Sequence, residues 1–453
     1  MRTERLVIIG GVAAGMSAAS RARAVNPTLE AVVLEKGDYV SYGTCGLAYL
    51  VSGAVREPDD LIVYTPDYFL KQRGIAVFTR HEVLEIVPGK KQVLVRRGEE
   101  VVPVDYDKLV IATGAAPAET IPGSESPGVF TCNDLAGALA LRQFILERRP
   151  RRGLVIGGGY IGLEVAEALR RRQLEVTVLE RSPHLLEDME AEIAQWVKER
   201  LAAHQVRLEL NTAVQWIDRA SDASLVVTAE GGRVFPADVV VLATGVVPRA
   251  ELAARAGLET GPSGALRTDD RQQTNLPGIY AAGDCVETLH RVTGSRVFMP
   301  LGTTANKQGR VAGENAAGGN ARFQGIVGTL STQVFGLEVA RTGLSWAGAR
   351  AAGFGGAELV TLESRSRAKY LEGKPLRVTL VADRASGRLL GGQLAGEEGA
   401  ARRVDVLATA LAAQMTVEDF VHLDLGYAPP FGPVYDPLLV AAWQALKKVG
   451  RRR

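Results

Sequence analysis

The chain has 453 residues, a formal net charge of +2, 46% hydrophobic and 23% charged residues, and three cysteines. This length suits two or three domains. The near-neutral charge gives no field that would attract nucleic acid or a membrane surface. Sparse cysteines exclude a secreted disulfide framework, and the first apolar strand begins too early for a signal peptide. No apolar run approaches the roughly 18 residues of a membrane span. We therefore expect a cytoplasmic protein.

The N-terminal segment has the pattern of a nucleotide-binding βαβ unit. A buried strand at Leu6–Ile9 runs into the glycine-rich turn 10–15, which opens a helix of small residues at 16–24. A second strand, Ala31–Leu34, ends at Glu35, whose carboxylate suits a ribose diol. The glycines allow a tight turn, and the helix N-terminus offers free N–H groups to a pyrophosphate. A glycine-rich turn alone is a weak signal, but these parts occur in the expected order.

The same arrangement recurs further along the chain. A strand at Gly153–Ile156 leads into a full G-x-G-x-x-G motif at 157–162, a helix at 163–172 and a strand at Val176–Leu179 that ends at Glu180. Two dinucleotide sites in one chain are much more specific than one. They indicate one cofactor that stays bound and one that exchanges.

Two further strands end alike, at Leu109–Gly114 and at Val240–Gly245, each with Thr-Gly followed by a nearby proline. We interpret this pair as the two places where the chain crosses between the nucleotide domains. A third strand at 279–284 ends in the acid Asp284.

Cys45 is the most informative single residue. It lies ten residues after Glu35, and the other cysteines, Cys132 and Cys285, are far away in the sequence, where we expect structural roles. A two-cysteine reductase would carry a closely spaced pair here. A lone thiol instead implies a covalent bond to an external group, or oxidation to a sulfenate.

These motifs, together with the segment 300–310, resemble the single-cysteine branch of the FAD-dependent pyridine nucleotide-disulfide oxidoreductases, and most of all the coenzyme A-disulfide reductases. The branch also contains NADH oxidases, peroxidases and coenzyme A-dependent sulfur reductases. The resemblance covers nearly the whole chain. It implies an α/β fold with two Rossmann-like dinucleotide-binding domains, for FAD and NAD(P), and a C-terminal α+β dimerisation domain.

The two dinucleotide motifs, the two Thr-Gly strand ends and the resemblance together predict the domain boundaries. The expected parts are 1–116 (FAD domain, first part), 117–245 (NAD(P) domain), 246–323 (FAD domain, second part) and 324–453 (interface domain). In the last part we expect a strand at Leu376–Val381 and a helix at 400–414, with turns at 383–387 and at 390–392.

The resemblance assigns cofactor residues to both sites. Tyr160 is expected to cover the nicotinamide face of the flavin until NAD(P)H displaces it. Glu180 favours NADH because a carboxylate repels a 2′-phosphate, although Arg181 beside it leaves room for NADPH. The residues expected at FAD are Gly10, Gly11, Val12, Ala13, Ala14, Gly15, Glu35, Lys36, Val83, Thr113, Gly114, Gly283, Asp284, Leu301 and Thr304. Those expected at NAD(P) are Gly157, Gly159, Tyr160, Ile161, Gly162, Glu180 and Gly245.

The resemblance also implies a catalytic set. Cys45 would form a mixed disulfide with coenzyme A, and Tyr427, in a Tyr-Ala-Pro-Pro stretch, would reach it across the dimer interface. Tyr370 resembles a second such tyrosine. From the residues alone, Tyr427 is equally well an exposed packing residue beside a stiff loop. The residues expected to contact coenzyme A are Ser17, Arg21, Ser41, Thr44, Arg73 and Asn306. Ala24 replaces a basic residue of some relatives.

The expected activity is the NAD(P)H-dependent reduction of coenzyme A disulfide to two thiols by a homodimer with shared active sites. Relatives that reduce peroxide carry a histidine where this chain has Ala13, which weakens that alternative. The five histidines lack metal-ligand spacing, so we expect no metal. Three alternatives stay open: a peroxide-forming NADH oxidase, a coenzyme A-dependent sulfur or polysulfide reductase, and an electron-transfer reductase that serves a small redox protein.

Overall fold

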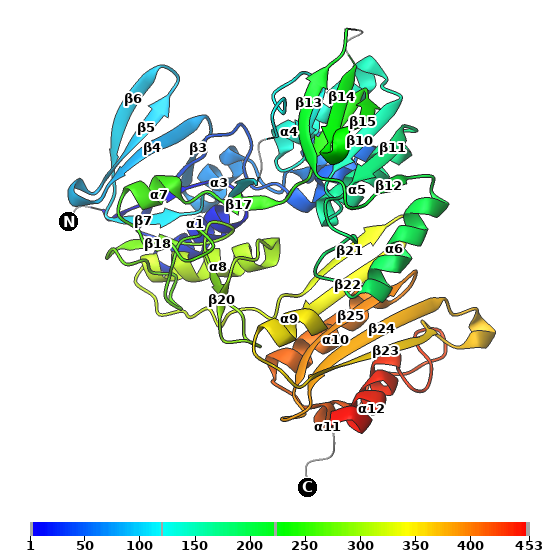
Figure 1. Ribbon diagram of the computed structural model, residues 1–453. Helices are drawn as coiled ribbons and strands as arrows, with labels where there is room; N and C mark the ends of the chain where they lie inside the picture. Colours follow the sequence, from blue (N-terminus) through cyan, green and yellow to red (C-terminus); the bar gives the residue numbers. More distant parts are fainter. Residues whose placement is uncertain (1–2, 119–120, 222–223, 450–453) are drawn as a thin grey trace.

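The computed structural model describes residues 3–118, 121–221 and 224–449. Within these ranges the strands form three five-stranded sheets and several small ones. Figure 1 shows the two parallel sheets side by side, with the antiparallel C-terminal sheet below them. None of the helices in the described ranges is both long enough and apolar enough to cross a membrane.

The first sheet is parallel, in the order β18-β7-β1-β2-β3. Its central strands consist of apolar residues. Helices α1 and α8 cover one face, and a three-stranded antiparallel sheet (His81–Asp105) with a short helix at Glu251–Arg255 covers the other. Helix α8 packs closely on α1, because a Cβ on Gly309 or Gly313 would lie 2.2 or 2.1 Å from a carbonyl oxygen of α1. The bounds are β1 Arg5–Ile9, α1 Ala13–Val25, β2 Glu30–Leu34, β3 Ile75–Phe78, β7 Lys108–Ile111, β18 Ile279–Ala281 and α8 Gly302–Ala316.

The second sheet repeats this topology in the order β12-β11-β10-β16-β9. Helix α2, which begins two residues after Cys45, packs against helices α4 and α5 of this unit, so the two units share one apolar core. The bounds are β9 Val129–Thr131, α4 Leu135–Arg148, β10 Arg152–Ile156, α5 Tyr160–Arg171, β11 Glu175–Leu179, α6 Ala191–Ala203, β12 Arg207–Glu209 and β16 Val239–Leu242.

Small elements connect and flank the two sheets. Strand β8 (Ala115–Pro117) pairs antiparallel with β17 (Val246–Pro248) at the two Thr-Gly strand ends. Each nucleotide unit also carries a three-stranded antiparallel sheet that packs on one face of its parallel sheet. The remaining bounds here are α2 Leu47–Ser52, α3 Pro66–Arg73, β4 His81–Val87, β5 Gln92–Arg97, β6 Glu100–Asp105, β13 Val214–Arg219, β14 Leu225–Ala229, β15 Arg233–Ala237, α7 Glu251–Arg255, β19 Thr288–Leu289 and β20 Arg296–Val297.

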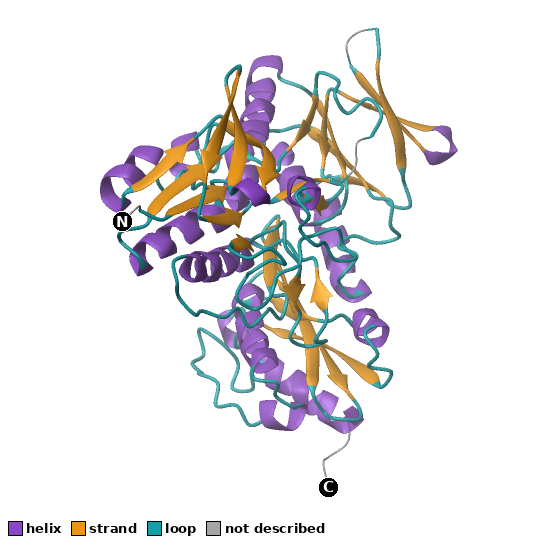
Figure 2. Cartoon of the chain, turned by 90° about the vertical axis from the view of Figure 1, so that its left-hand side faces the viewer, coloured by secondary structure: helices purple, strands orange, loops and turns teal. Residues whose placement is uncertain are grey.

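The C-terminal sheet is antiparallel, in the order β21-β22-β25-β24-β23. Helices α10 and α12 bury their apolar faces against it, and Figure 2 shows helices clustered at this end of the molecule. The bounds are β21 Leu330–Val334, β22 Leu337–Gly343, α9 Trp346–Ala351, β23 Ala357–Arg365, β24 Pro375–Asp383, β25 Leu389–Gly396, α10 Ala400–Ala412, α11 Val417–Phe420 and α12 Pro437–Val449.

Two local predictions were wrong. The expected turn at 390–392 lies inside β25, where the glycines permit close packing: a Cβ on Gly391 would lie 2.1 Å from the Leu344 carbonyl oxygen. The sequence pattern predicts a short helix at 67–72 with Arg73 after it. Arg73 instead ends helix α3, because the left-handed Gly74 is the C-cap.

Candidate active site

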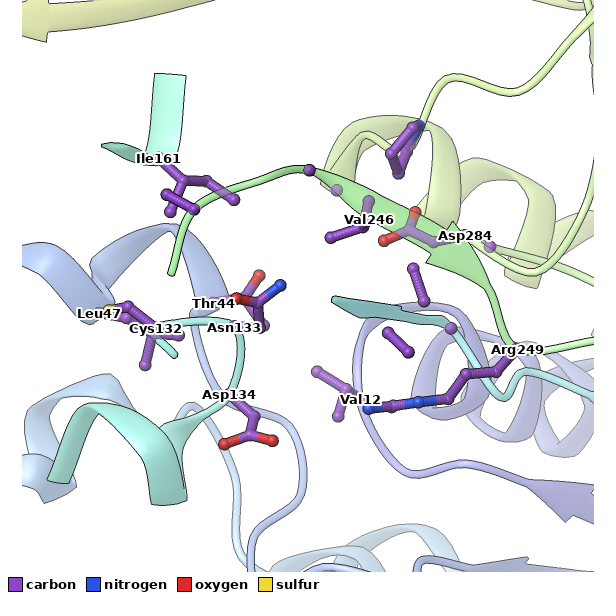
Figure 3. Close-up of a pocket in the computed structure, with 18 of the residues that line it drawn as sticks. Val12, Thr44, Leu47, Cys132, Asn133, Asp134, Ile161, Val246, Arg249 and Asp284 are labelled. Carbon is purple, nitrogen blue, oxygen red and sulfur yellow. The ribbon is translucent and has the colours of Figure 1, made fainter. Parts of the chain in front are cut away.

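A large cavity lies between the two parallel sheets. Its volume is about 1350 Å³, and both glycine-rich loops line it. Such a volume exceeds that of an ordinary small-molecule site. Figure 3 shows Thr44, Cys132 and Asn133 on one side of it, with Val246 and Asp284 opposite. The cavity therefore has room for more than one large ligand.

The first glycine loop presents backbone donors to this cavity. Gly10 has a φ of +104°, and a Cβ there would lie 2.2 Å from the Ala112 carbonyl oxygen, so only glycine fits. The Glu35 carboxylate accepts hydrogen bonds from the N–H groups of Gly11 and Gly37, both at 2.7 Å. Among the described residues, no side chain caps the N-terminus of α1. Its N–H groups are thus available to a phosphate.

The second loop has the same construction. Gly157 has a φ of +113°, and a Cβ there would lie 2.2 Å from the Ala243 carbonyl oxygen. The Glu180 carboxylate accepts from the N–H groups of Gly158 at 2.6 Å and Ser182 at 2.7 Å. The N-terminus of α5 likewise lacks a side-chain cap within the described chain.

Asp284 follows β18 and faces the cavity (Figure 3). Burial raises the pKa of its carboxyl group. In the described part of the chain its carboxylate has no hydrogen-bond partner, so it suits a hydroxyl-bearing ligand. Leu301 and Gly302, at the uncapped start of α8, line the same region. These features fit FAD: loop N–H groups for its pyrophosphate, Glu35 for its ribose and Asp284 for its ribityl hydroxyls.

Cys45 lies in the cavity wall, in a single 3₁₀ turn (Thr44–Gly46) that continues into α2. It is exposed, and its thiol is free. The turn is held in place because the Gly43 N–H donates to the Leu61 carbonyl oxygen at 2.8 Å. At the far end of α2, Arg172 donates to the Val51 carbonyl oxygen at 2.7 Å. A thiol in this position contacts both the cavity and solvent.

The cavity brings together most of the sequence-predicted cofactor residues. Those that line it are Gly10, Gly11, Val12, Ala13, Ala14, Glu35, Lys36, Val83, Thr113, Gly114, Gly283, Asp284, Leu301, Gly157, Gly159, Tyr160, Ile161, Glu180 and Gly245. Gly15 and Gly162 lie behind their loops, where a Cβ would sit 1.9 Å from the Gly10 and 2.0 Å from the Gly157 carbonyl oxygen. Thr304 is buried in the first turn of α8.

The residues predicted for coenzyme A lie outside the cavity, apart from Thr44. The Ser17 hydroxyl donates to Asn306 Oδ1 at 2.7 Å, which joins α1 to α8. Arg21 forms an ion pair with Glu314 at 2.6 Å. The Arg73 guanidinium lies 5.9 Å from the centroids of two tyrosine rings, Tyr64 and Tyr68. Ser41 has a left-handed backbone, with a φ of 49°, beside the cysteine turn.

Tyr370 and Tyr427 lie together on the C-terminal domain, away from the cavity of their own subunit. Their exposed fractions are 73% and 48%. Desolvation and the neighbouring Tyr370 hydroxyl raise the pKa of Tyr427. The structure therefore pairs these two phenols with each other, and within one chain it does not bring them to Cys45.

Sequence reasoning missed several residues of this site. Cys132, two residues ahead of the α4 N-cap Asp134, lines the cavity, and burial raises its pKa to about 12, so its thiol stays protonated. Glu164, one turn after Tyr160, also lines it and accepts from the Thr332 hydroxyl at 2.7 Å. The G-x-G-x-x-G motif predicts the helix that carries Glu164, but it does not predict Thr332 as the hydrogen-bond partner of Glu164.

Two dinucleotide loops facing one cavity with a free thiol in its wall define a flavin- and nicotinamide-dependent thiol oxidoreductase. The family model for pyridine nucleotide-disulphide oxidoreductase matches residues 4–309, and the dimerisation domain of that family matches 330–437. The chain belongs to this family, whose members use FAD and NAD(P)H. Its dimerisation domain indicates a homodimer.

Known relatives match over nearly the whole chain. An NAD(P)H coenzyme A polysulfide/persulfide reductase of Pyrococcus horikoshii is 38% identical over 97% of this chain and 98% of its own length. A coenzyme A disulfide reductase of Staphylococcus haemolyticus is 28% identical over 97% and 99%. The solved NAD-dependent persulfide reductase from A. fulgidus has 40% identity and a TM-score of 0.95, with 98% of this chain and 83% of that chain covered.

Proposed function

We propose that this protein reduces sulfur–sulfur bonds carried by coenzyme A, with coenzyme A disulfide as the substrate and Cys45 as the nucleophile. The observation that carries the proposal is the free, exposed Cys45 thiol in the wall of the cavity that both glycine loops line. A thiol that contacts both the cavity and solvent suits exchange with a large external disulfide.

The chemistry begins with attack of the Cys45 thiolate on one sulfur of the disulfide. A Cys45–S–S–CoA bond forms, the substrate S–S bond breaks, and one coenzyme A thiolate departs. The partner subunit's Tyr427 donates a proton to that thiolate. FAD held by the first glycine loop, Glu35 and Asp284 would supply the route for the two electrons of NAD(P)H. Reduction of the mixed disulfide would break its S–S bond, release the second coenzyme A thiolate and restore the Cys45 thiolate. The sum is NAD(P)H, one proton and one disulfide giving NAD(P)⁺ and two thiols.

The substrate would lie across α1 and α8 of the first unit. Ser17 and Asn306 provide a polar pair there, and Arg21 provides a cation next to it. Coenzyme A carries a pyrophosphate and a 3′-phosphate, both of which favour guanidinium groups. Arg21 already pairs with Glu314, so the phosphate would share or replace that carboxylate. Glu180, at the second loop, would favour NADH, and Arg181 beside it leaves room for NADPH.

The first test compares wild type with Cys45→Ser and Tyr427→Phe. Cys45→Ser should abolish reduction of coenzyme A disulfide but leave NADH-dependent reduction of ferricyanide, which needs no thiol. Tyr427→Phe should lower disulfide turnover roughly 100-fold. Tyr435→Phe, which removes another exposed phenol of the C-terminal domain, is the matched control. Undiminished disulfide turnover in Cys45→Ser would refute the proposal in favour of direct electron transfer.

A second candidate acceptor is a coenzyme A persulfide or polysulfide. It is favoured by identities of 38 to 40% to proteins named as persulfide or sulfur reductases, against 28% to named coenzyme A disulfide reductases. The same Cys45 attack would then release hydrosulfide in place of a coenzyme A thiolate. Turnover numbers with the two acceptors, with sulfide quantified directly, decide between them.

A further inference from the structure

Tyr160 occupies the passage between the two glycine loops. It is the first residue of α5, directly after the second loop, and it lines the cavity that continues to the first loop. Its neighbour Ile161 lies on the cavity wall in Figure 3. The phenol ring of Tyr160 therefore belongs to the cavity wall that a dinucleotide at the second loop would face.

The hydroxyl of Tyr160 is held by a charged acceptor. It donates to Asp188 Oδ1 at 3.0 Å. The other oxygen of Asp188 forms an ion pair with Arg341, whose side chain is only 8% exposed. Arg341 also donates to the Gly343 carbonyl oxygen at 3.1 Å. Tyr160 is therefore bound to a carboxylate that a buried cation orients, which strengthens the hydrogen bond.

Asp188 is fixed to the C-terminal domain, not to a free loop. Gln393 of β25 donates to the Asp188 carbonyl oxygen at 3.2 Å and accepts from the Glu190 N–H at 2.7 Å. The Trp346 N–H donates to the Glu190 carboxylate at 2.7 Å. These contacts clamp the segment 188–190 against the C-terminal sheet. The acceptor of the Tyr160 hydrogen bond therefore stays in place when the tyrosine moves.

We propose that Asp188 and Arg341 form a latch that holds Tyr160 across the passage, so that a bound nicotinamide must break the Tyr160–Asp188 hydrogen bond. Asp188 and Arg341 are positioning residues that contact neither nucleotide. The latch lowers the apparent affinity for any nucleotide that carries a nicotinamide, because only the unlatched fraction binds it. It leaves the affinity for the adenosine portion unchanged. This inference rests on the NAD(P)H site at the second loop and is independent of coenzyme A.

The test uses the flavin-loaded enzyme with ferricyanide as electron acceptor, an assay that does not involve Cys45. Three constants are measured: KM for NADH, and inhibition constants for NAD⁺ and for ADP-ribose, which lacks the nicotinamide. In Tyr160→Phe and Asp188→Asn, KM for NADH and Ki for NAD⁺ should fall together by about tenfold. Ki for ADP-ribose should stay unchanged.

Two features keep the experiment decisive. Tyr160→Phe leaves the Asp188–Arg341 pair intact, so it remains informative where Asp188→Asn fails to fold. Glu192→Gln is the matched control, since it removes an exposed carboxylate four residues along the same segment. Equal shifts for NAD⁺ and ADP-ribose, or no shift in either, would overturn the latch. Retained ferricyanide activity with failed disulfide turnover would count only against the proposed substrate.

Discussion

The glycine loops of the two nucleotide-binding units share their backbone construction but differ in the residue that starts the following helix. Both loops begin with a left-handed glycine, with φ of +104° at Gly10 and +113° at Gly157. Both receive a carboxylate from the end of the next strand. The first helix then starts with Ala13 and the second with Tyr160. The same backbone construction thus presents a methyl group to the cavity at the first loop and a phenol ring at the second.

The largest expected effect comes from breaking each loop in turn. Gly10→Ala and Gly157→Ala each place a Cβ 2.2 Å from a carbonyl oxygen, at a φ that costs a non-glycine residue about 1–3 kcal/mol. Gly10→Ala should reduce bound flavin to about a tenth of wild type. Gly157→Ala should retain flavin and raise KM for NADH at least about tenfold. Flavin absorbance per chain and steady-state kinetics measure these outcomes. Flavin loss from Gly157→Ala would contradict the assignment of the loops.

A smaller effect should follow from neutralising the two carboxylates. Glu180→Gln removes the negative charge that receives two N–H donors, and charge-assisted bonds are worth about 1.5–3 kcal/mol. KM for NADH should rise about tenfold, while KM for NADPH should stay or fall. The ratio of kcat/KM for the two nucleotides measures the effect. The counterpart Glu35→Gln should weaken flavin retention and leave that ratio unchanged.

The smallest expected effect concerns Glu164, one turn after Tyr160. Burial raises the pKa of its carboxyl group, and the Thr332 hydroxyl opposes that shift. A raised pKa means that proton binding stabilises the fold at low pH, and that this contribution is lost as pH rises through the folded-state pKa. Glu164→Gln keeps the acceptor oxygen without the charge. Its Tm should exceed that of wild type by roughly 1–2 °C at pH 8, with the difference vanishing near pH 4. A larger Tm gain at pH 4 than at pH 8 would contradict the predicted direction of this pH dependence.

Local patterns in the sequence predicted the nucleotide units well. Strands β1 and β10 each start only one residue before the predicted strand. The agreement is close because each apolar run is directly followed by a glycine turn that marks its end. Both helices start earlier than predicted, at Ala13 and Tyr160, inside the motif itself. The loop residues that line the cavity follow from the same local rules, since a G-x-G-x-x-G turn faces its ligand wherever it occurs.

Contacts between distant segments could not be predicted in this way. Asp188 and Arg341 are separated by 153 residues, and neither belongs to a motif. Cys132 was interpreted as structural, yet it lines the cavity, because only the packing of α2 on α4 brings it there. Gly391 looked like a turn because its sequence neighbours do not reveal the Leu344 backbone that crosses it. Each of these positions depends on packing between elements that are distant in the sequence.

The bond between Arg172 and the Val51 carbonyl oxygen has a mechanical consequence. Arg172 is the C-cap of α5, and Val51 lies in the last turn of α2, two residues before the left-handed C-cap Gly53. A hinge motion that swung the nicotinamide half away from the flavin half would pull on the helix that begins two residues after Cys45. The bond therefore couples any such motion to the position of the cysteine turn.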